Sequence, residues 1–154
     1  MYATFNAGIS CQTNKNTIRE FPLVIATVAK VSRKRGLWLI AHEKADMPAG
    51  CTLLGLSALP TEHPLNKGML GMHGNLGPNI NTNKCDVLIA VGMRFDDRVT
   101  GDLKTYAKQA KIIHLDIDNS EIGKNVPVDV KVLGNAKHTI PMITALLGER
   151  KRPE

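Results

Sequence analysis

Aromatic side chains are scarce in this sequence, and their scarcity excludes one class of function. Phe, Trp and Tyr together make up 4% of the 154 residues, too few for the stacking platforms with which proteins hold single-stranded nucleic acid. A net charge of +6 can by itself indicate a nucleic-acid partner. Here the excess lies in two clusters, at residues 30–35 and 150–152, and the body between them mixes both signs. We therefore expect solvated charged faces and no nucleic-acid partner.

Cysteine and long apolar runs are also in short supply. The cysteines Cys11, Cys51 and Cys85 lie far apart, which fits neither a disulfide framework nor a zinc site. Cys51 and Cys85 stand in or beside apolar runs and are expected to be small core residues. No run approaches the ~20 apolar residues that a transmembrane helix needs, and the first residues do not form a secretory signal. The sequence predicts a cytoplasmic protein with no membrane partner.

The common catalytic signatures are missing as well. No GxGxxG follows a predicted strand, and there is no GxxxxGK[ST] phosphate loop. No HExxH or His/Cys cluster indicates a metal, and no G-x-S-x-G marks a hydrolase nucleophile. The sequence therefore predicts no catalytic residue and no metal ligand.

What the sequence does contain is apolar runs that alternate with helix-like segments. Strands are predicted at residues 21–31, 49–56, 86–92, 111–118 and 128–134. The run at 86–92 is apolar throughout, which indicates a strand covered on both faces. Helices are predicted at 37–48, 75–85, 100–110 and 138–150, with a short helical turn at 119–125 and a long connection from 57 to about 77.

Three caps are expected for these helical segments: Thr100, Asn119 and Thr139, the last leaving Pro141 in the first turn. The alternation of strands and helices predicts an α/β domain whose parallel sheet has helices on both faces. We expect an irregular leader at residues 1–20, one domain at 21–148 and a charged tail at 149–154. Parallel sheets of this kind bind ligands at the carboxyl ends of their strands.

A group of charged residues follows the predicted strand at 86–92. Gly92 would let a ligand approach the backbone, and Arg94 and Arg98 suit a diphosphate because a guanidinium offers two parallel charged hydrogen bonds. Asp96 and Asp97 can orient these arginines or bind hydroxyl groups. The alternative is a surface turn in which the four charges neutralise one another, and spacing alone leaves both interpretations open.

Two other segments end at the same predicted edge. Asp116, Asp118 and Glu121 follow the strand at 111–118, where an acid commonly binds ribose hydroxyls; N-capping by Asp118 or Asn119 would account for one of them. The loop "GMLGMHG" at 68–74 contains three glycines around Met72, an adaptable apolar contact. The neighbouring His73 is either a hydrogen-bond donor to a ligand or an ordinary loop histidine.

Three segments carry a family resemblance: "CTLLGLSALPTEHPLNKGMLGMHG", "CDVLIAVGMRFDDRVTG" and "KIIHLDIDNSEIGKN". From about residue 39 to 147 the chain resembles the central domain of the acetolactate synthase (acetohydroxyacid synthase) large subunit, in the thiamine-diphosphate-dependent enzyme family. The resemblance implies a Rossmann-like, three-layer α/β fold with about six mainly parallel strands that holds FAD, without net redox work. It also implies a parent enzyme that condenses two pyruvates, or pyruvate and 2-oxobutyrate, in branched-chain amino acid biosynthesis.

The resemblance also assigns FAD contacts, residue by residue. Those along the flavin and ribityl chain are Thr52, Leu53, Gly71, Met72 and His73. Those at the ribityl and diphosphate region are Gly92, Arg94, Asp96, Arg98 and Val99. Those at the adenosine end are Asp116, Ile117, Glu121 and Ile122.

The chain also departs from the family pattern. The thiamine diphosphate signature and the domain with the catalytic glutamate are absent, so we expect this chain alone to bind neither thiamine diphosphate nor Mg²⁺ and to leave pyruvate unchanged. Its implied partners are FAD and the missing pyrimidine- and diphosphate-binding domains, in a homo-oligomer with a regulatory small subunit. Residues 22–36 lack the family's glycine-rich turn, and Asn135 stands where an aspartate is usual. Two alternatives stay open: a non-binding structural or assembly domain, and an NAD-type nucleotide-binding domain of the same fold.

Overall fold

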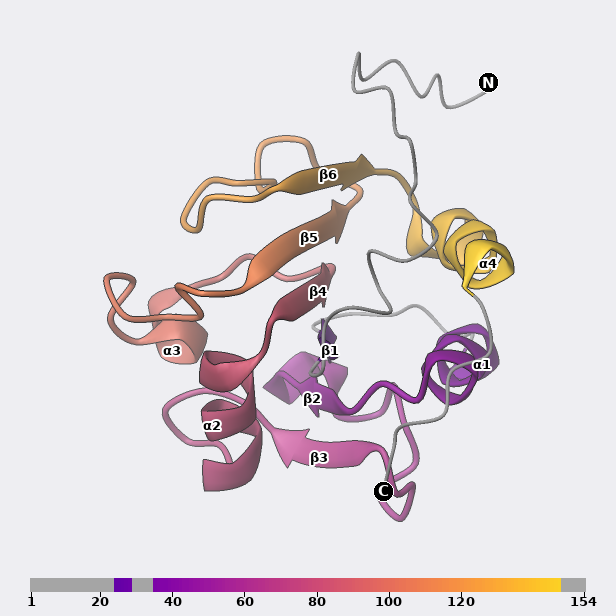
Figure 1. The fold of residues 1–154 in the computed structure, drawn as a ribbon, viewed down its shortest axis with the longest axis horizontal. Helices are drawn as coiled ribbons and strands as arrows, with labels where there is room; N and C mark the ends of the chain where they lie inside the picture. Colours follow the sequence, from indigo (N-terminus) through magenta and orange to yellow (C-terminus); the bar gives the residue numbers. More distant parts are fainter. Residues whose placement is uncertain (1–23, 29–34, 148–154) are drawn as a thin grey trace.

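The computed structural model describes residues 24–28 and 35–147, and the side chains of residues 40–147. The predicted leader, the predicted tail, Cys11 and most of the altered segment at 22–36 lie outside these residues. The described residues form one sheet with helices on each side of it (Figure 1).

The sheet has six strands in the order β3-β2-β1-β4-β5-β6, and every neighbouring pair is parallel. The chain order reverses between β1 and β4, as in doubly wound dinucleotide-binding sheets. The strands are β1 (Val24–Val28), β2 (Ala49–Cys51), β3 (Asn66–Met69), β4 (Val87–Val91), β5 (Lys111–Asp116) and β6 (Val130–Leu133). The predicted Rossmann-like α/β fold with a parallel sheet is confirmed.

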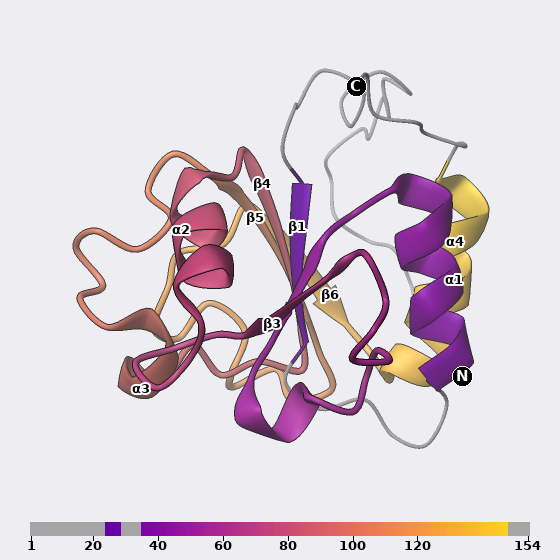
Figure 2. The same cartoon turned by 90° about the horizontal axis from the view of Figure 1, so that it is seen from below.

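The helices form the two outer layers. α1 (Arg35–Ala45) and α4 (Ala136–Leu146) pack together on one face, and α2 (Leu76–Lys84) and the short α3 (Asp97–Thr100) lie on the other (Figure 2). A short 3-10 helix, η1 (Leu53–Gly55), follows β2. Among the described helices, none combines the length and the apolar character that crossing a membrane requires.

Strand β4 separates two hydrophobic clusters. Val87, Ile89 and Val91 belong to a cluster on the side of α1 and α4, whereas Leu88 and Ala90 belong to one on the opposite side. Successive side chains of a strand point to opposite faces, so a continuous apolar run is what a strand between two cores requires. The predicted burial of this strand on both faces is confirmed, and Cys51 and Cys85 are core residues with 0% exposure.

The segment from 49 to 77 differs from the prediction. The expected strand at 49–56 ends at Cys51, because the chain turns into η1, where Leu53 and Leu54 are exposed to 71% and 76%. The predicted connection contains the unexpected strand β3, "NKGM". This strand lies at the edge of the sheet and pairs only with β2, so backbone hydrogen bonds and not an apolar pattern hold it.

The predicted helix at 100–110 is also wrong. Thr100 is the last residue of α3 and not an N-cap, and residues 101–110 form turns. Gly101 and Ala107 both have positive φ, at 60° and 43°, which a helix does not allow. The amide of Ala107 donates to Asn83 Oδ1 of α2 at 3.0 Å, so a contact distant in sequence overrides the local helix propensity.

Two expected caps fall on other residues. Residues 119–123 form turns and no helix, and Asp118 rather than Asn119 accepts the hydrogen bond from the Ser120 amide. Helix α4 begins at Ala136, with Asn135 as its N-cap accepting from the Lys137 amide at 2.9 Å. The Asn135 that departs from the family pattern therefore caps a helix, as an aspartate also does. Pro141 consequently lies inside the helix and not in its first turn.

Candidate ligand-binding site

The predicted contact residues all lie at or beyond the carboxyl ends of β2, β3, β4 or β5. Because the strands are parallel, these ends lie along one edge of the sheet. In the register, Val91 lies beside Leu115, which brings Gly92 next to Asp116, and the Gly92 amide donates to Leu115 O at 2.8 Å. The predicted diphosphate and ribose segments are therefore neighbours.

The glycine loop after β3 packs directly against the segment after β4. The Met72 amide donates to the Arg98 carbonyl at 2.8 Å. Gly71 has φ +99°, and a Cβ atom built on it would lie 2.5 Å from the same Arg98 oxygen. Both the backbone conformation and the close approach therefore require glycine at this position. The structure thus brings together two of the predicted segments, Gly71–His73 and Arg98–Val99.

Helix α2 holds this loop with asparagine side chains. Asn79 Oδ1 accepts from the Gly71 amide at 2.9 Å, and Asn79 Nδ2 donates to the Gly71 carbonyl at 2.9 Å. Asn75 Oδ1 accepts from the amide of Met69, the last residue of β3. These asparagines lie four residues apart, on one side of the helix. They explain why so polar a segment is helical, and sequence reasoning missed them as supports of the site.

The four charged residues after β4 do not neutralise one another. Arg94 and Arg98 are exposed, and neither forms an ion pair within the described residues. Asp97 Oδ1 accepts from the Arg98 amide at 3.0 Å. Asp96 Oδ1 is buried and has no hydrogen-bond partner among the described residues, which is costly in the absence of a donor. The segment therefore presents two unpaired cations and a buried acceptor.

Phe95, between these residues, is held in a strained conformation. Its φ of +52° is left-handed, which costs a non-glycine residue about 1–2 kcal/mol. The ring is buried, with its centroid 6.0 Å from that of Tyr106 and 5.0 Å from that of His114, both edge to face. Packing of this kind fixes the backbone that carries Arg94 and Asp96. Strained backbone persists where the surrounding structure over-determines it, and it clusters at functional sites.

The three acids at the end of β5 and after it have different partners. Asp118 Oδ1 accepts from Ser120 Oγ at 2.7 Å and from the Ser120 amide at 2.9 Å, and these hydrogen bonds lower the pKa of Asp118. Asp116 is 8% exposed, and its Oδ1 accepts from the Asp118 amide. Glu121 pairs with Lys124 Nζ at 3.3 Å. The turn therefore uses Asp118 and one oxygen of Asp116.

Large apolar side chains are exposed along the same edge. Leu53, Met72 and Ile117 are exposed to 71%, 68% and 69%, and exposed apolar surface rimmed by polar groups marks binding sites. His73 is exposed too, whereas the side chains of Thr52 and Ile122 are buried. The edge thus offers apolar contacts beside the two arginines.

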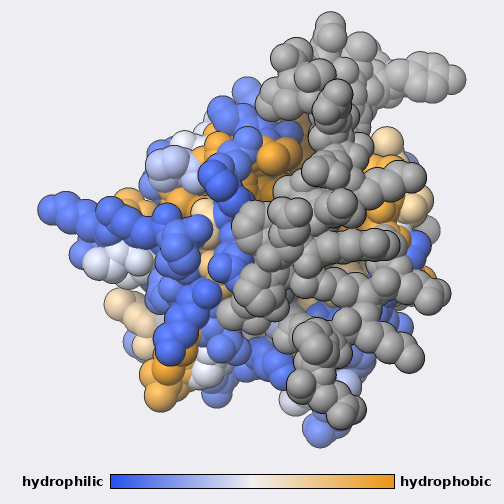
Figure 3. Space-filling model, viewed as in Figure 1, coloured by the Kyte–Doolittle hydropathy of each residue, from blue (hydrophilic) through white to orange (hydrophobic). Residues whose placement is uncertain are grey.

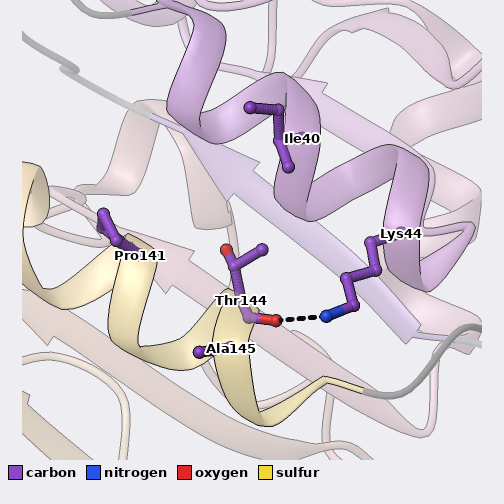
Figure 4. A pocket seen from close by; sticks show the side chains of 5 residues that line it. All are labelled: Ile40, Lys44, Pro141, Thr144 and Ala145. Atoms are coloured by element: carbon purple, nitrogen blue, oxygen red, sulfur yellow. Dashed lines mark hydrogen bonds between the residues drawn. The ribbon is translucent and has the colours of Figure 1, made fainter.

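A hollow elsewhere in the structure has a different character. It has a volume of about 350 Å³ and lies between α1 and α4, lined by Ile40, Lys44, Pro141, Thr144 and Ala145 (Figure 4). Its only charged group, Lys44 Nζ, already donates to the Thr144 carbonyl at 3.0 Å. None of the predicted contact residues lines it. The charged and glycine-rich residues point to the carboxyl edge and not to this hollow.

The fold defines the class of doubly wound α/β domains, a class in which ligands commonly bind at the topological switch point. Comparison with known families gives the particular one. Residues 29–143 match the model of the family described as "Thiamine pyrophosphate enzyme, central domain". The chain belongs to this family, and the resemblance found from its motifs is confirmed.

Similar proteins are acetolactate synthase large subunits. The chain is 50% identical over 105 residues to the probable acetolactate synthase large subunit of Methanocaldococcus jannaschii, covering 68% of this chain and 18% of the relative. It is 47% identical over 103 residues to the isozyme 2 large subunit of Escherichia coli, covering 67% and 19%. For the Haemophilus influenzae large subunit the identity is 42% over 107 residues, covering 70% and 19%. The match therefore spans less than a fifth of each relative.

Proposed function

We propose that this chain acts as the FAD-holding central domain of an enzyme of the acetolactate synthase type. The parent enzyme would condense two pyruvates, or pyruvate and 2-oxobutyrate, in branched-chain amino acid biosynthesis in the cytoplasm. Thiamine diphosphate and Mg²⁺ would bind to its pyrimidine- and diphosphate-binding domains, in a homo-oligomer with a regulatory small subunit. The chain by itself would hold FAD and leave pyruvate unchanged.

One observation carries the proposal: Arg94 and Arg98 stand exposed and, among the described residues, without an ion-pair partner at the end of the central strand β4. A diphosphate supplies the negative charge that these guanidinium groups lack, through charged, bidentate hydrogen bonds. The Arg98 backbone is already fixed by the Met72 amide. Arg98 is therefore held on a rigid support, which limits the entropy lost on binding.

The rest of the edge fits the other parts of FAD. Asp116 and Glu121 lie beside the arginine segment and would accept hydrogen bonds from ribose hydroxyls. The exposed side chains of Leu53 and Met72 would contact the flat flavin ring. The buried Oδ1 of Asp96, without a partner among the described residues, would accept from a hydroxyl of the ribityl chain. When bound, FAD would supply no electrons in this role and would instead tie the strand-end loops together.

Titration of the 154-residue chain with FAD tests the proposal. Binding should change the flavin absorbance and, at a hundredfold excess over Kd, stabilise the fold by about 2.7 kcal/mol. Arg94→Ala and Arg98→Ala should each weaken binding by about tenfold, because each removes a charged hydrogen bond. Lys104→Ala is the matched control, since Lys104 is an exposed cation in the turns after α3. No binding by the wild type would refute FAD binding, and unchanged affinity in both arginine variants would refute the role of Arg94 and Arg98 in holding the diphosphate.

An assembly role is the second candidate, and exposed apolar residues of α4 and β6 favour it. Met142 and Leu146 of α4 and Leu133 of β6 are exposed to 52%, 84% and 54%, and Figure 3 shows apolar surface beside these two elements. Such surface is typical of contacts with neighbouring domains. If the wild type binds no FAD and both arginine variants behave in the same way, the assembly role is favoured. Displacement of FAD by NAD at equal concentration would instead favour an NAD-type site.

A further inference from the structure

We propose that Asn125 is a positioning residue that fixes the backbone of Arg94, so that its guanidinium meets the phosphates of the bound ligand. The inference rests on the proposed function. Asn125 was not among the predicted contacts, and its side chain points to the backbone and not to the expected ligand. It would therefore act through Arg94 and not by touching the ligand.

The side chain of Asn125 holds two successive carbonyls. Its Nδ2 donates to Arg94 O at 3.1 Å and to Phe95 O at 3.1 Å. A side-chain amide nitrogen carries two hydrogens and can serve two acceptors at once, whereas a serine or threonine hydroxyl carries one. Asparagine is therefore suited to this contact.

The backbone geometry at Arg94 and Phe95 explains why these two carbonyls need the hydrogen bonds from Asn125, which we call the clamp. Successive carbonyls of an extended strand point in opposite directions, and here both approach one nitrogen because Phe95 has a φ of +52°. The buried Phe95 ring anchors the segment from the core, against Tyr106 and His114. Asn125 anchors it from the opposite end, at the carbonyls. Between these anchors the direction of the exposed Arg94 side chain is set.

Asn125 also connects the two halves of the proposed site. It belongs to the segment after β5 that contains Glu121, and the amide of Gly123 in the same segment donates to His114 Nδ1 at 3.4 Å. The clamp thus joins the segment after β4, which carries the arginines, to the segment after β5, which carries the acids. One side chain fixes the separation between the phosphate-binding and ribose-binding groups.

Binding measurements with a ligand series test the proposal in the full chain. Asn125→Ala should weaken FAD and ADP by about tenfold each, because both carry a diphosphate, and should leave the affinity for adenosine unchanged. Asn125→Asp should bind more weakly still, since a carboxylate repels two carbonyl oxygens. Asn119→Ala is the matched control, an exposed asparagine of the same segment after β5. An equal loss for adenosine would show general loosening and overturn the proposal.

A double-mutant cycle measures the energetic coupling between Asn125 and Arg94. If Asn125 acts through Arg94, the double variant with Arg94→Ala and Asn125→Ala should bind FAD no more weakly than Arg94→Ala alone. Losses that add would mean that the two residues act independently, which contradicts the proposal.

A ligand-free measurement separates this inference from FAD binding itself. The amides of Val99 and Thr100 donate to Asp96 O, next to the clamped carbonyls. Their hydrogen exchange should accelerate at least fivefold in Asn125→Ala and stay unchanged in Asn119→Ala. Unchanged exchange in Asn125→Ala overturns the inference even if FAD binds. Failure of the wild type to bind FAD or ADP overturns the proposed function, and with it the ligand role of Asn125, while faster exchange would still establish the clamp.

Discussion

Replacing Gly71 by alanine is the sharpest perturbation of the carboxyl edge. Gly71 joins the loop after β3 to the segment after β4, and nothing larger than hydrogen fits on its Cα atom. The new methyl carbon would lie 2.5 Å from Arg98 O and 3.3 Å from Val99 Cα, at a φ of +99°. Both neighbouring atoms belong to the backbone, so neither can rotate away.

The expected cost follows from two contributions. A positive φ costs an alanine about 1–2 kcal/mol. Relief of the clash would separate the loop from Arg98 and break the hydrogen bond from Met72 N to Arg98 O, at about 1 kcal/mol. We expect Gly71→Ala to lower the free energy of unfolding by about 3 kcal/mol, the sum of these contributions at their upper end. Because Arg98 shifts with the loop, affinity for FAD should also fall.

Two other glycines supply matched controls for denaturation measurements. Gly101 has φ +60°, and a methyl group added to it would meet no heavy atom within 4 Å, so Gly101→Ala carries the backbone cost without the clash, about 1–2 kcal/mol. Gly77 lies in α2 with open space around it, so Gly77→Ala should stabilise the fold by about 0.5–1 kcal/mol. If Gly71→Ala costs no more than Gly101→Ala, the close contact with Arg98 does not constrain the loop.

Three further predictions concern residues that are not among the predicted ligand contacts. Burial lowers the pKa of His42 to about 4, so the folded chain keeps it neutral while the unfolded chain protonates it near pH 6.5. Stability should therefore fall by about 3 kcal/mol as pH drops from 6.5 to 4, at about 1.36 kcal/mol per pKa unit, and thermal melts across this range would show it. Lys44→Met should cost about 1 kcal/mol in urea, because the Thr144 carbonyl at the end of α4 loses its donor. Asn79→Ala should cost about 2 kcal/mol and accelerate hydrogen exchange at Gly71, because two hydrogen bonds to that residue are lost.

Each of these predictions has a control. A melting temperature that does not change between pH 7 and 5 would contradict the assignment to His42, and His42→Gln should reduce the dependence. Lys104→Met removes an exposed lysine, and Asn81→Ala removes an asparagine of α2 for which no contact to the loops is seen among the described residues. Equal losses in these variants would mean that the charge or the helix, and not the specific hydrogen bond, sets the stability.

Much of the fold could be predicted from the sequence, because burial on both faces leaves a strong signal. β4 is the clearest case, with apolar, buried residues at every position; β5 shows a weaker form of the signal, with Ile112, Ile113 and Leu115. β3 could not be predicted, since an edge strand reading "NKGM" has no pattern of alternation. The segment 101–110 has helix-forming residues, yet hydrogen bonds from Ala107 and Gln109 to the end of α2 hold it as turns. Such long-range contacts cannot be recognised in the local sequence.

The location of the candidate site was also predictable, unlike its internal geometry. Parallel strands bring the segments at their carboxyl ends to one edge, so Arg94 and Asp116 had to be neighbours once the topology was correct. Whether the arginines pair with the nearby aspartates depends on side-chain directions that spacing does not determine. Asn79 and Asn125 escaped notice because a side-chain amide in a turn looks the same whether it caps its own backbone or holds a distant one.

The alternation along β4 means that the sheet acts as a partition between two mechanically separate compartments. Ile89 faces the compartment of α1 and α4, so shortening it to valine should loosen the helices and leave ligand affinity unchanged. Leu88 faces the compartment that also holds Met93 and Phe95, so shortening it to alanine removes support from beneath Arg94. Neighbouring residues of one strand thus control different properties, and overall stability can vary in this domain without disturbing the edge that we propose as its ligand site.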